Sequence, residues 1–537
     1  MYIEPNTNIK LLKNVPLDNS YSNTIFFTDK SSQLVYFSSK VKHNLANYTY
    51  QRVNKGSMRV GLSADKCYDC NYLMFQNTSY GSKWFYAFIT SVEYINNEVC
   101  EIRFEIDVMQ TWFYSCTLKQ CFVEREHSET DNVGDNIQPE PVNVGEYVVS
   151  DYSQLTAMND NVIIVTIVDV EGGSNGELYD GIYGGAQLWA YQASDVVSIN
   201  SKIDSYKEKP ESILSIYMCP ALFIPDVPTG GKKLVYGTGA SPNIVSTDPL
   251  NDNADFQGYV PKNKKLYTYP YNYFNLDNAN GNSLPLRYEF FDNLTPVVEI
   301  TGVITQPVKC VARPCSYKGV PSQTELGGYT SLNSESISLE SYPICSWNTD
   351  TWSQFVAQQS VPIALSVISG TGTTAANVAM ANMMNARSAN PLSENEQSDK
   401  NKLAVSGGIL SSVCSTMSTI YSASIASDIC RGSFNNGGVN FSNNKQQFFK
   451  SRVHITKNHC EAIDNFFSVF GYKTNLIKTP NINSRPHWNY VKTINCTIVG
   501  EAPSDDIATI CGIFNNGITF WKNGDEVGNY NLDNSPV

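Results

Sequence analysis

Alternating apolar and polar positions mark the first part of the chain as strand-forming. From Cys100 to Val108 every second residue is apolar, and each residue between two apolar ones is charged. This period of two is typical of a strand with one buried face. The apolar run from Trp84 to Thr90 precedes it, and Asn96-Asn97 between the two runs predicts a hairpin turn. The strand would expose a charged row made of Glu101, Arg103, Glu105 and Asp107.

The same pattern predicts further elements along the chain. Apolar runs at Val162 to Val170, Ile213 to Ile224 and Val297 to Thr305 predict strands. Helical spacing predicts one helix from Ser194 to Glu208, stopped by Pro210, and another from Lys457 to Phe470. We therefore expect a mainly β fold with some α.

One long segment departs from this pattern because it is almost free of charge. Arg387 is the one charged residue between Asp350 and Glu394, and there is none between Lys402 and Asp428, although 17% of the whole chain is charged. These two arms are rich in Ala, Ser, Gly, Thr and Met and flank a charged island that begins at Glu394. Such a segment is costly to expose to water, and its residues are too small for an ordinary large core. It predicts a helical or loop hairpin that is kept hidden.

Two interpretations of this hairpin remain open. In the first, it is a structural segment, either a helical hairpin packed inside an oligomer or a poorly ordered insertion. In the second, it is a membrane-active loop that is shielded until needed. In the second arm small residues recur at every fourth position, as in closely packed membrane helices. The candidate membrane-active positions are its apolar residues, namely Ile363, Leu365, Val367, Ile368, Val378, Met380, Met383, Met384, Leu403, Val405, Ile409, Leu410, Val413, Met417, Ile420, Tyr421 and Ile425.

Composition narrows the class of protein. A chain of 537 residues predicts two to four domains, and 12% aromatic residues favour a β-rich globular protein. The net charge of -13 and the lack of any Lys/Arg-rich run argue against specific nucleic-acid recognition. The N-terminal residues do not resemble a signal peptide, and 14 scattered cysteines suit a reducing compartment, so we expect assembly in a cytoplasm.

Candidate chemistry is sparse. Cys67 and Cys70 form a single C-x-x-C motif, which we interpret as two free thiols because a structural zinc site needs four ligands. His454, His459 and Cys460 are close in sequence, on what we expect to be one helix, with surface or interface roles. No nucleophile, metal or phosphate-binding motif is recognised. The sequence therefore predicts no enzyme, no metal and no cofactor.

Several stretches near both ends of the chain resemble one family of proteins. They lie in the same order as in that family, and the segment that is almost free of charge lies between the N-terminal and the C-terminal ones. The stretches are Tyr72 to Asn77, Tyr80 to Phe88, Phe104 to Trp112, Phe122 to His127, Phe470 to Asn475, Arg485 to Thr493 and Ile513 to Trp521. They resemble the distal tail tube, or tail knob, proteins of small short-tailed phages of the picovirus type.

The resemblance implies a ring of six copies built from β-barrel-like tail-tube domains. We expect an N-terminal tube domain over residues 1–150, a second β-rich tube or knob region over 151–350, the hairpin over 351–435 and a C-terminal segment over 436–537. The lumen would conduct the viral double-stranded DNA, with Glu101, Glu105 and Asp107 as candidate acidic wall residues. The hairpin would plug the tube and later enter the host membrane. Other partners would be the neighbouring tail and collar proteins of the virion.

A second interpretation belongs to another class. The Tyr- and Asn-rich middle of the chain also suits a receptor-binding or baseplate protein that recognises cell-wall carbohydrate.

Overall fold

The computed structural model describes residues 6–48, 56–77, 81–158, 160–168, 178–179, 182–183, 186–206, 212–234, 242–304, 308–319, 335–340, 342, 344–346, 431–433 and 446–536. The chain divides into two compact units. Unit 1 is formed by Met1–Gly145, Asp255–Leu266 and Thr456–Val537, and unit 2 by Glu146–Ala254 and Tyr267–Ile455. Each unit is therefore assembled from segments that are far apart in the sequence.

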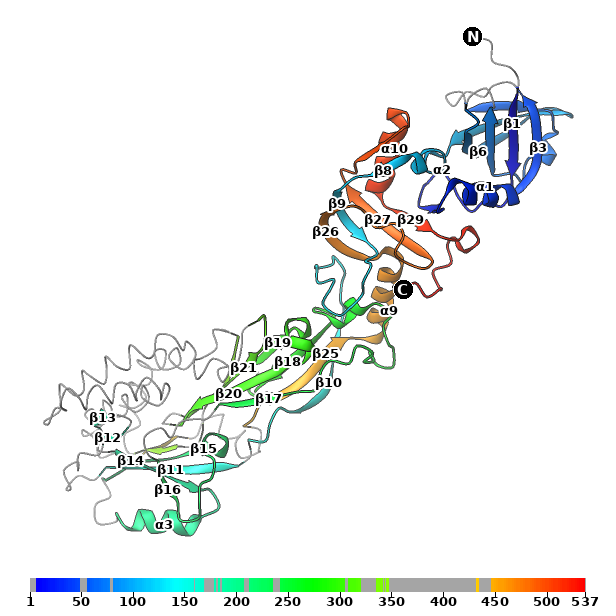
Figure 1. Ribbon diagram of the computed structural model, residues 1–537. Helices are drawn as coiled ribbons and strands as arrows, with labels where there is room; N and C mark the ends of the chain where they lie inside the picture. Colours follow the sequence, from blue (N-terminus) through cyan, green and yellow to red (C-terminus); the bar gives the residue numbers. More distant parts are fainter. Residues whose placement is uncertain are drawn as a thin grey trace, which may run out of the picture. The chain divides into compact units, whose positions relative to one another are not determined.

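The first sheet of unit 1 has six strands in the order β3-β1-β5-β6-β7-β4 (Figure 1). Its central strand β5 is buried on both faces, so its sequence is almost continuously apolar. Leu73 and Phe75 face one core, whereas Tyr72 and Met74 face a second core that also contains Phe37 of helix α1. The elements are β1 (Thr7–Leu12), α1 (Lys30–Ser39), β3 (Val41–Tyr48), β4 (Ser57–Val60), β5 (Tyr72–Asn77), β6 (Trp84–Asn96), β7 (Val99–Ile106) and α2 (Val108–Trp112).

The second sheet of unit 1 joins the two ends of the chain. Its order is β2-β29-β27-β9-β26, and β2 pairs in parallel with β29 although they are almost 500 residues apart in sequence. Helix α10 packs on this sheet through Ile510, Ile513 and Phe514. The elements are β2 (Asn23–Ile25), β9 (Cys121–Glu126), α9 (Lys457–Phe470), β26 (Tyr472–Lys478), β27 (Trp488–Ile494), α10 (Ser504–Asn516) and β29 (Ile518–Trp521), beside a two-stranded ladder of β8 (Cys116–Leu118) and β28 (Ile498–Gly500).

The described residues of unit 2 form three larger sheets and one short hairpin, β12 with β13. The sheets have the orders β10-β25-β18-β19, β16-β14-β11-β15-β23-β24 and β17-β20-β21-β22, and helix α3 covers the second of them through Ile199. The first sheet consists of β10 (Tyr147–Gln154), β25 (Phe449–Ile455), β18 (Asn272–Asp277) and β19 (Ser283–Leu286). The remaining elements are β11 (Asn161–Val168), β12 (Leu178–Tyr179), β13 (Ile182–Tyr183), β14 (Ala186–Gln192), α3 (Val196–Asp204), β15 (Ile213–Pro220), β16 (Lys232–Leu234), β17 (Asn243–Ser246), β20 (Val297–Val303), β21 (Lys309–Cys315), β22 (Ile337–Leu339), β23 (Ile344–Ser346) and β24 (Arg431–Ser433).

The fold confirms the expectation of a mainly β protein with some α. The hairpin of β6 and β7 is confirmed, since Asn96 pairs with Val99 and leaves Asn97-Glu98 as the turn. The predicted helix at Lys457 to Phe470 is α9, and the other predicted helix is α3, which is shorter at both ends. The predicted strands are β11, β15 and β20. The ring of six copies, the low-charge hairpin over residues 351–435 and the region boundaries at 150, 350 and 435 remain predictions.

Candidate functional site

The first candidate site is the charged row of β7. Glu105 and Arg103 are exposed and Glu101 is partly exposed, while Cys100, Ile102 and Phe104 are buried in the core of the first sheet. The strand therefore has the one-sided burial that its sequence predicts. Glu101 and Glu105 lie on a face that is open to solvent, and their role as wall residues remains a prediction.

Neighbouring strands place cations beside this row. The Arg59 Nε lies 3.2 Å from Glu101 Oε2, and the Arg103 Nε lies 2.9 Å from Glu93 Oε1. Glu93 of β6 pairs directly with Glu101, so the two guanidinium groups offset the repulsion of these facing carboxylates. Glu105 accepts a hydrogen bond from Asn19 Nδ2 at 3.1 Å. The carboxylates of Glu93, Glu101 and Glu105 thus outnumber the guanidinium groups by one, and this surface is weakly acidic.

The prediction that Asp107 belongs to the exposed charged row is wrong, because Asp107 does not lie on the exposed face. Its side chain is 1% exposed. The strand ends at Ile106, and Asp107 becomes the N-cap of α2, where Oδ1 accepts from Gln110 N at 3.0 Å and Oδ2 accepts from Tyr72 Oη at 2.9 Å. Burial raises the pKa of Asp107 to about 6, although these hydrogen bonds act in the opposite direction. Its role is to fix the end of the strand, and it cannot line a channel.

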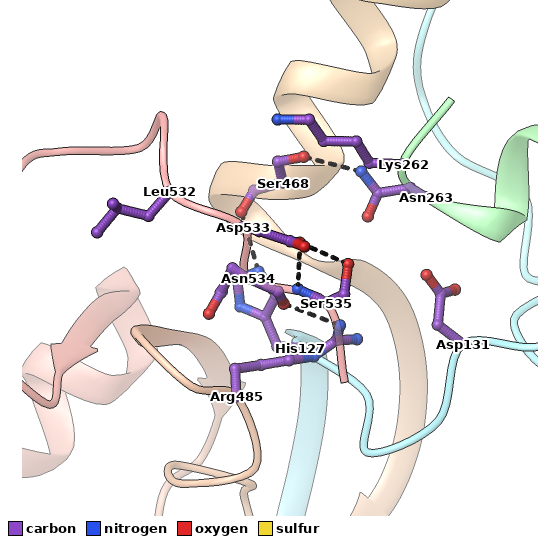
Figure 2. Close-up of a pocket in the computed structure, with 10 residues that line it drawn as sticks. All are labelled: His127, Asp131, Lys262, Asn263, Ser468, Arg485, Leu532, Asp533, Asn534 and Ser535. Carbon is purple, nitrogen blue, oxygen red and sulfur yellow. Dashed lines mark hydrogen bonds between the residues drawn. The ribbon is translucent and has the colours of Figure 1, made fainter. Parts of the chain in front are cut away.

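The second candidate site is a small pocket in unit 1, between α9 and the C-terminal residues (Figure 2). Both ring nitrogens of His127 are engaged, since Nδ1 accepts from Tyr490 N at 2.8 Å and Nε2 donates to Ser468 O at 3.1 Å. Burial, followed by the charge of Arg485, lowers the pKa of His127 to about 3, so the ring is neutral and poorly placed to transfer protons. The pocket is lined by His127, Asp131, Lys262, Asn263, Ser468, Arg485, Leu532, Asp533, Asn534 and Ser535.

Arg485 holds the C-terminal residues against this pocket. Its Nε donates to Ser128 O at 3.0 Å and its NH1 donates to Asn534 O at 3.2 Å. Asn534 in turn donates from Nδ2 to Trp488 O at 2.8 Å and accepts from the backbone of His487 and Trp488. These contacts tie three segments of unit 1 together, which is a structural task.

Asp464 of α9 organises the base of the same region. This carboxylate is 1% exposed and accepts from Tyr259 Oη at 2.6 Å, from Lys262 N at 2.9 Å and from Asn263 N at 3.0 Å. Asn263 Nδ2 also donates to Asp464 Oδ1, at 2.8 Å. The segment of residues 255–266 is thereby anchored to a helix about 200 residues further along the chain. A sequence pattern gives no signal for this contact, because each partner is an ordinary polar residue.

The remaining predictions concern two histidines, the C-x-x-C thiols and the candidate membrane-active residues. His454 is not on a helix with His459, because it lies in β25 and is buried, whereas His459 is on α9 and contacts Thr456. Cys67 and Cys70 are buried thiols, with the Cys67 Sγ 3.7 Å from Cys100 Sγ, and burial raises the pKa of Cys67 to about 12. The candidate membrane-active residues from Ile363 to Ile425 lie outside the described residues.

No helix in the described part of the chain combines the length and the apolar character needed to cross a bilayer. Within the same residues, no group of three or more His, Cys, Asp or Glu is placed to hold a metal ion.

Comparison with known structures supports the fold. The structure is similar over 99% of this chain, and 100% of the other, to the tail knob protein gp12 of bacteriophage C1, with a TM-score of 0.62 and 15% identity. Residues 5–117, which contain the whole first sheet of unit 1, match the model of the caudoviral major tail protein N-terminus.

Sequence comparison extends over nearly the whole chain. The tail knob protein gp9 of Bacillus phage phi29 is 25% identical, and those of Bacillus phages PZA and B103 are each 24% identical, with 98% of both chains covered in each case. Residues 241–535 match the family model of the C-terminal domain of the phi29 tail knob protein gp9. Because this match takes in more than half of the 537 residues, the chain belongs to the tail knob protein gp9 family and is a structural protein of a phage tail.

Proposed function

We propose that this tail knob protein forms the distal tail tube as a ring of six copies and conducts the genome during ejection. The observation that carries the proposal is the match of residues 5–117 to the N-terminal part of a major tail protein, because that range contains the complete six-stranded sheet. A closed ring of identical copies requires one surface of each copy to contact a different surface of the next. We propose this arrangement for the tube, with neighbouring tail and collar proteins at its ends.

The charge of the chain supports passage of DNA without tight binding. The net charge is -13, and the β7 row carries more carboxylates than guanidinium groups. Carboxylates repel phosphates, whereas neutralising cations would hold them and release counterions. We propose that Glu101 and Glu105 face the lumen and that the DNA touches the wall only non-specifically.

We further propose that residues 351–435 plug the tube and then enter the host membrane. The composition of the two arms supports this, since arms with a single charged residue, Arg387, are unfavourable to expose to water and are tolerated in the bilayer interface. Six copies would shield one another's arms inside the ring until ejection begins. The protein would be assembled in the host cytoplasm, where its thiols stay reduced.

We propose that the protein acts without catalysis. Burial and the charge of Arg485 lower the pKa of the histidine in the unit 1 pocket, and both of its ring nitrogens are hydrogen-bonded. Asp464 accepts four hydrogen bonds from Tyr259, Lys262 and Asn263. Groups fixed in this way hold the fold and are poorly placed to transfer protons.

Deletion of Pro362 to Ser427 tests the membrane role. We expect the deleted chain to assemble as the wild type does but to lose release of dye from liposomes. A matched control replaces the same residues with a Gly/Ser linker of equal length, which keeps the chain length and removes the apolar side chains. Unchanged dye release from both variants would reject the membrane role and leave the tube itself intact as a proposal.

A further inference from the structure

One face of the first sheet of unit 2 carries exposed aromatic rings, mainly at its edge strand β10, while Ser451, Val453 and Ile455 of the inner strand β25 are buried on the same face. In β18 the residues Asn272, Phe274 and Leu276 are buried, whereas the alternate residues Tyr273, Asn275 and Asp277 are half-exposed. A sheet with one buried and one solvated face normally shows polar, charged residues on the solvated side. Here that side carries the ring of Tyr273 beside the polar residues Asn275 and Asp277.

The strands place these rings on the same side. Val149 pairs with Val453 of β25, and Val453 pairs with Tyr273 of β18, so the three share a face. Two residues further along, a bulge with Asp151 at φ 54° shifts the register of the edge strand β10. Tyr152 stacks on Phe449 after that shift, with ring centres 5.0 Å apart and planes at 12°. The edge strand therefore presents both of its tyrosines on one side.

The rings lie in two groups, Tyr273 with Tyr147 and Tyr269, and Tyr152 with Phe449. We call these five residues the tyrosine face. Tyr273 lies 5.7 Å from Tyr147 and 5.9 Å from Tyr269, measured between ring centres. The exposed fractions are 42% for Tyr147, 55% for Tyr152 and 39% for Tyr269. Large side chains that are exposed together in this way mark an interaction surface.

The polar groups of the tyrosine face are available to a partner. Within the described residues, the hydroxyl groups of its four tyrosines have no hydrogen-bond partner, and neither does the side-chain amide of Asn275. Burial, followed by the charge of Asp277, raises the pKa of the Tyr152 hydroxyl. Asp277 lies at the end of the same row, and its Oδ1 accepts a hydrogen bond from Ala279 N. Flat apolar rings thus alternate with unused hydrogen-bond donors and acceptors.

We propose that the tyrosine face binds a neutral oligosaccharide. The C–H faces of a sugar ring pack on aromatic rings, and its hydroxyl groups need the donors and acceptors that the tyrosine hydroxyls, Asn275 and Asp277 provide. From Tyr147 to Tyr152 the strand spans on the order of 15 Å, the length of about three linked hexoses. This inference is independent of the proposed tube, since it concerns unit 2 alone.

The polar groups of the face favour a sugar over a lipid surface or a polyanion. A lipid surface would leave the tyrosine hydroxyl groups and the Asn275 amide without partners, whereas tyrosine is also common where two proteins meet, so a contact between copies of the chain is one outcome of the test below. A polyanion would need clustered cations, and the guanidinium closest to these rings, that of Arg287, is stacked 4.4 Å from the Tyr269 ring centre. Amphipathic rings with free hydroxyl groups therefore favour a neutral, hydroxyl-rich partner.

Calorimetric titration of the full-length protein tests this proposal. The probes are chitotriose, cellotriose and maltotriose, together with a sedimentation assay on peptidoglycan stripped of its anionic polymers. We expect at least one probe to bind, and we expect Tyr147→Ser combined with Tyr152→Ser to weaken that binding at least tenfold. Asn275→Ala should weaken it several-fold without removing any ring. Tyr68→Ser is the control, because Tyr68 is 60% exposed but lies in unit 1.

Each outcome decides the question. Binding that is lost in the double variant and in Asn275→Ala, and kept in Tyr68→Ser, supports the proposal. Absence of binding to every probe at millimolar concentration overturns it. Loss of self-association in the double variant without saccharide binding overturns it too, and identifies the face as a contact between copies. If the double variant does not fold, Asn275→Ala alone decides, because that substitution leaves every ring in place.

Discussion

Replacing Asp464 with alanine tests whether one buried carboxylate holds the segment of residues 255–266 in unit 1. The side chain is 1% exposed and accepts hydrogen bonds from Tyr259, from the backbone of Lys262 and from both the backbone and the side chain of Asn263. Alanine removes the acceptor but leaves these donors where they are. The variant therefore measures the cost of unsatisfied donors in a buried site.

The magnitude follows from the two backbone donors. Each buried donor that loses its acceptor costs about 1–3 kcal/mol, while Tyr259 is able to turn its hydroxyl towards water. Removal of the desolvated charge returns part of this cost. We expect the free energy of unfolding of unit 1 to fall by about 4 kcal/mol, which lowers Tm by about 8–16 °C for a unit of this size.

The assay is thermal unfolding followed by near-ultraviolet circular dichroism, because Trp488 and Trp521 are both buried in unit 1. The control is Glu461→Ala, which removes an acidic residue from the same helix. Glu461 forms an exposed i,i+4 pair with Lys457, with 3.7 Å between Lys457 Nζ and Glu461 Oε1, so its loss should cost less than about 0.5 kcal/mol. If the two variants unfold at the same temperature, the anchoring role of Asp464 is refuted.

Two further substitutions test local features of unit 1. Gly471 follows α9 at φ 63°, and an added Cβ would lie 2.2 Å from Glu126 O, so Gly471→Ala should destabilise unit 1 by at least about 2 kcal/mol in chemical denaturation. Gly528→Ala, also at positive φ but with open space around the added Cβ, should cost clearly less, and equal losses would reject the steric argument. Burial raises the pKa of Asp107 from 3.8 to about 6, so the folded chain binds this proton more tightly and gains stability as pH falls from about 6 to about 4. The free energy of unfolding of the wild type should therefore rise by about 2 kcal/mol relative to that of Asp107→Asn between pH 7 and pH 4, and a difference that is constant with pH would contradict the raised pKa.

Elements with a regular local pattern could be predicted from the sequence. Helix α9 begins and ends where its pattern indicates because its buried residues Cys460, Ile463 and Phe467 recur at helical spacing and Gly471 stops it. Helix α10 was not predicted, although Ile507, Ile510 and Phe514 recur at the same spacing. That signal was available, since two aspartates in the first turn also favour a helix start.

Residues whose role depends on distant partners could not be predicted. Asp107 continues the alternation of β7, and nothing in the local pattern shows that the strand has already ended and that Asp107 caps a helix. Asp464 meets donors that are about 200 residues away in the sequence. The tyrosine face also combines β10, β18 and β25, which come from three separate parts of the chain. Only the folded topology brings such side chains together.

The symmetry of the assembled protein tests the central proposal most directly. We would reconstruct the tail of the virion by electron cryomicroscopy without imposed symmetry and count the copies of this chain around the tail axis. The proposed tube predicts six copies around an open or plugged axial channel, with Glu101 and Glu105 facing that channel. A trimeric spike, or a ring whose channel is lined by other surfaces of the chain, would contradict it.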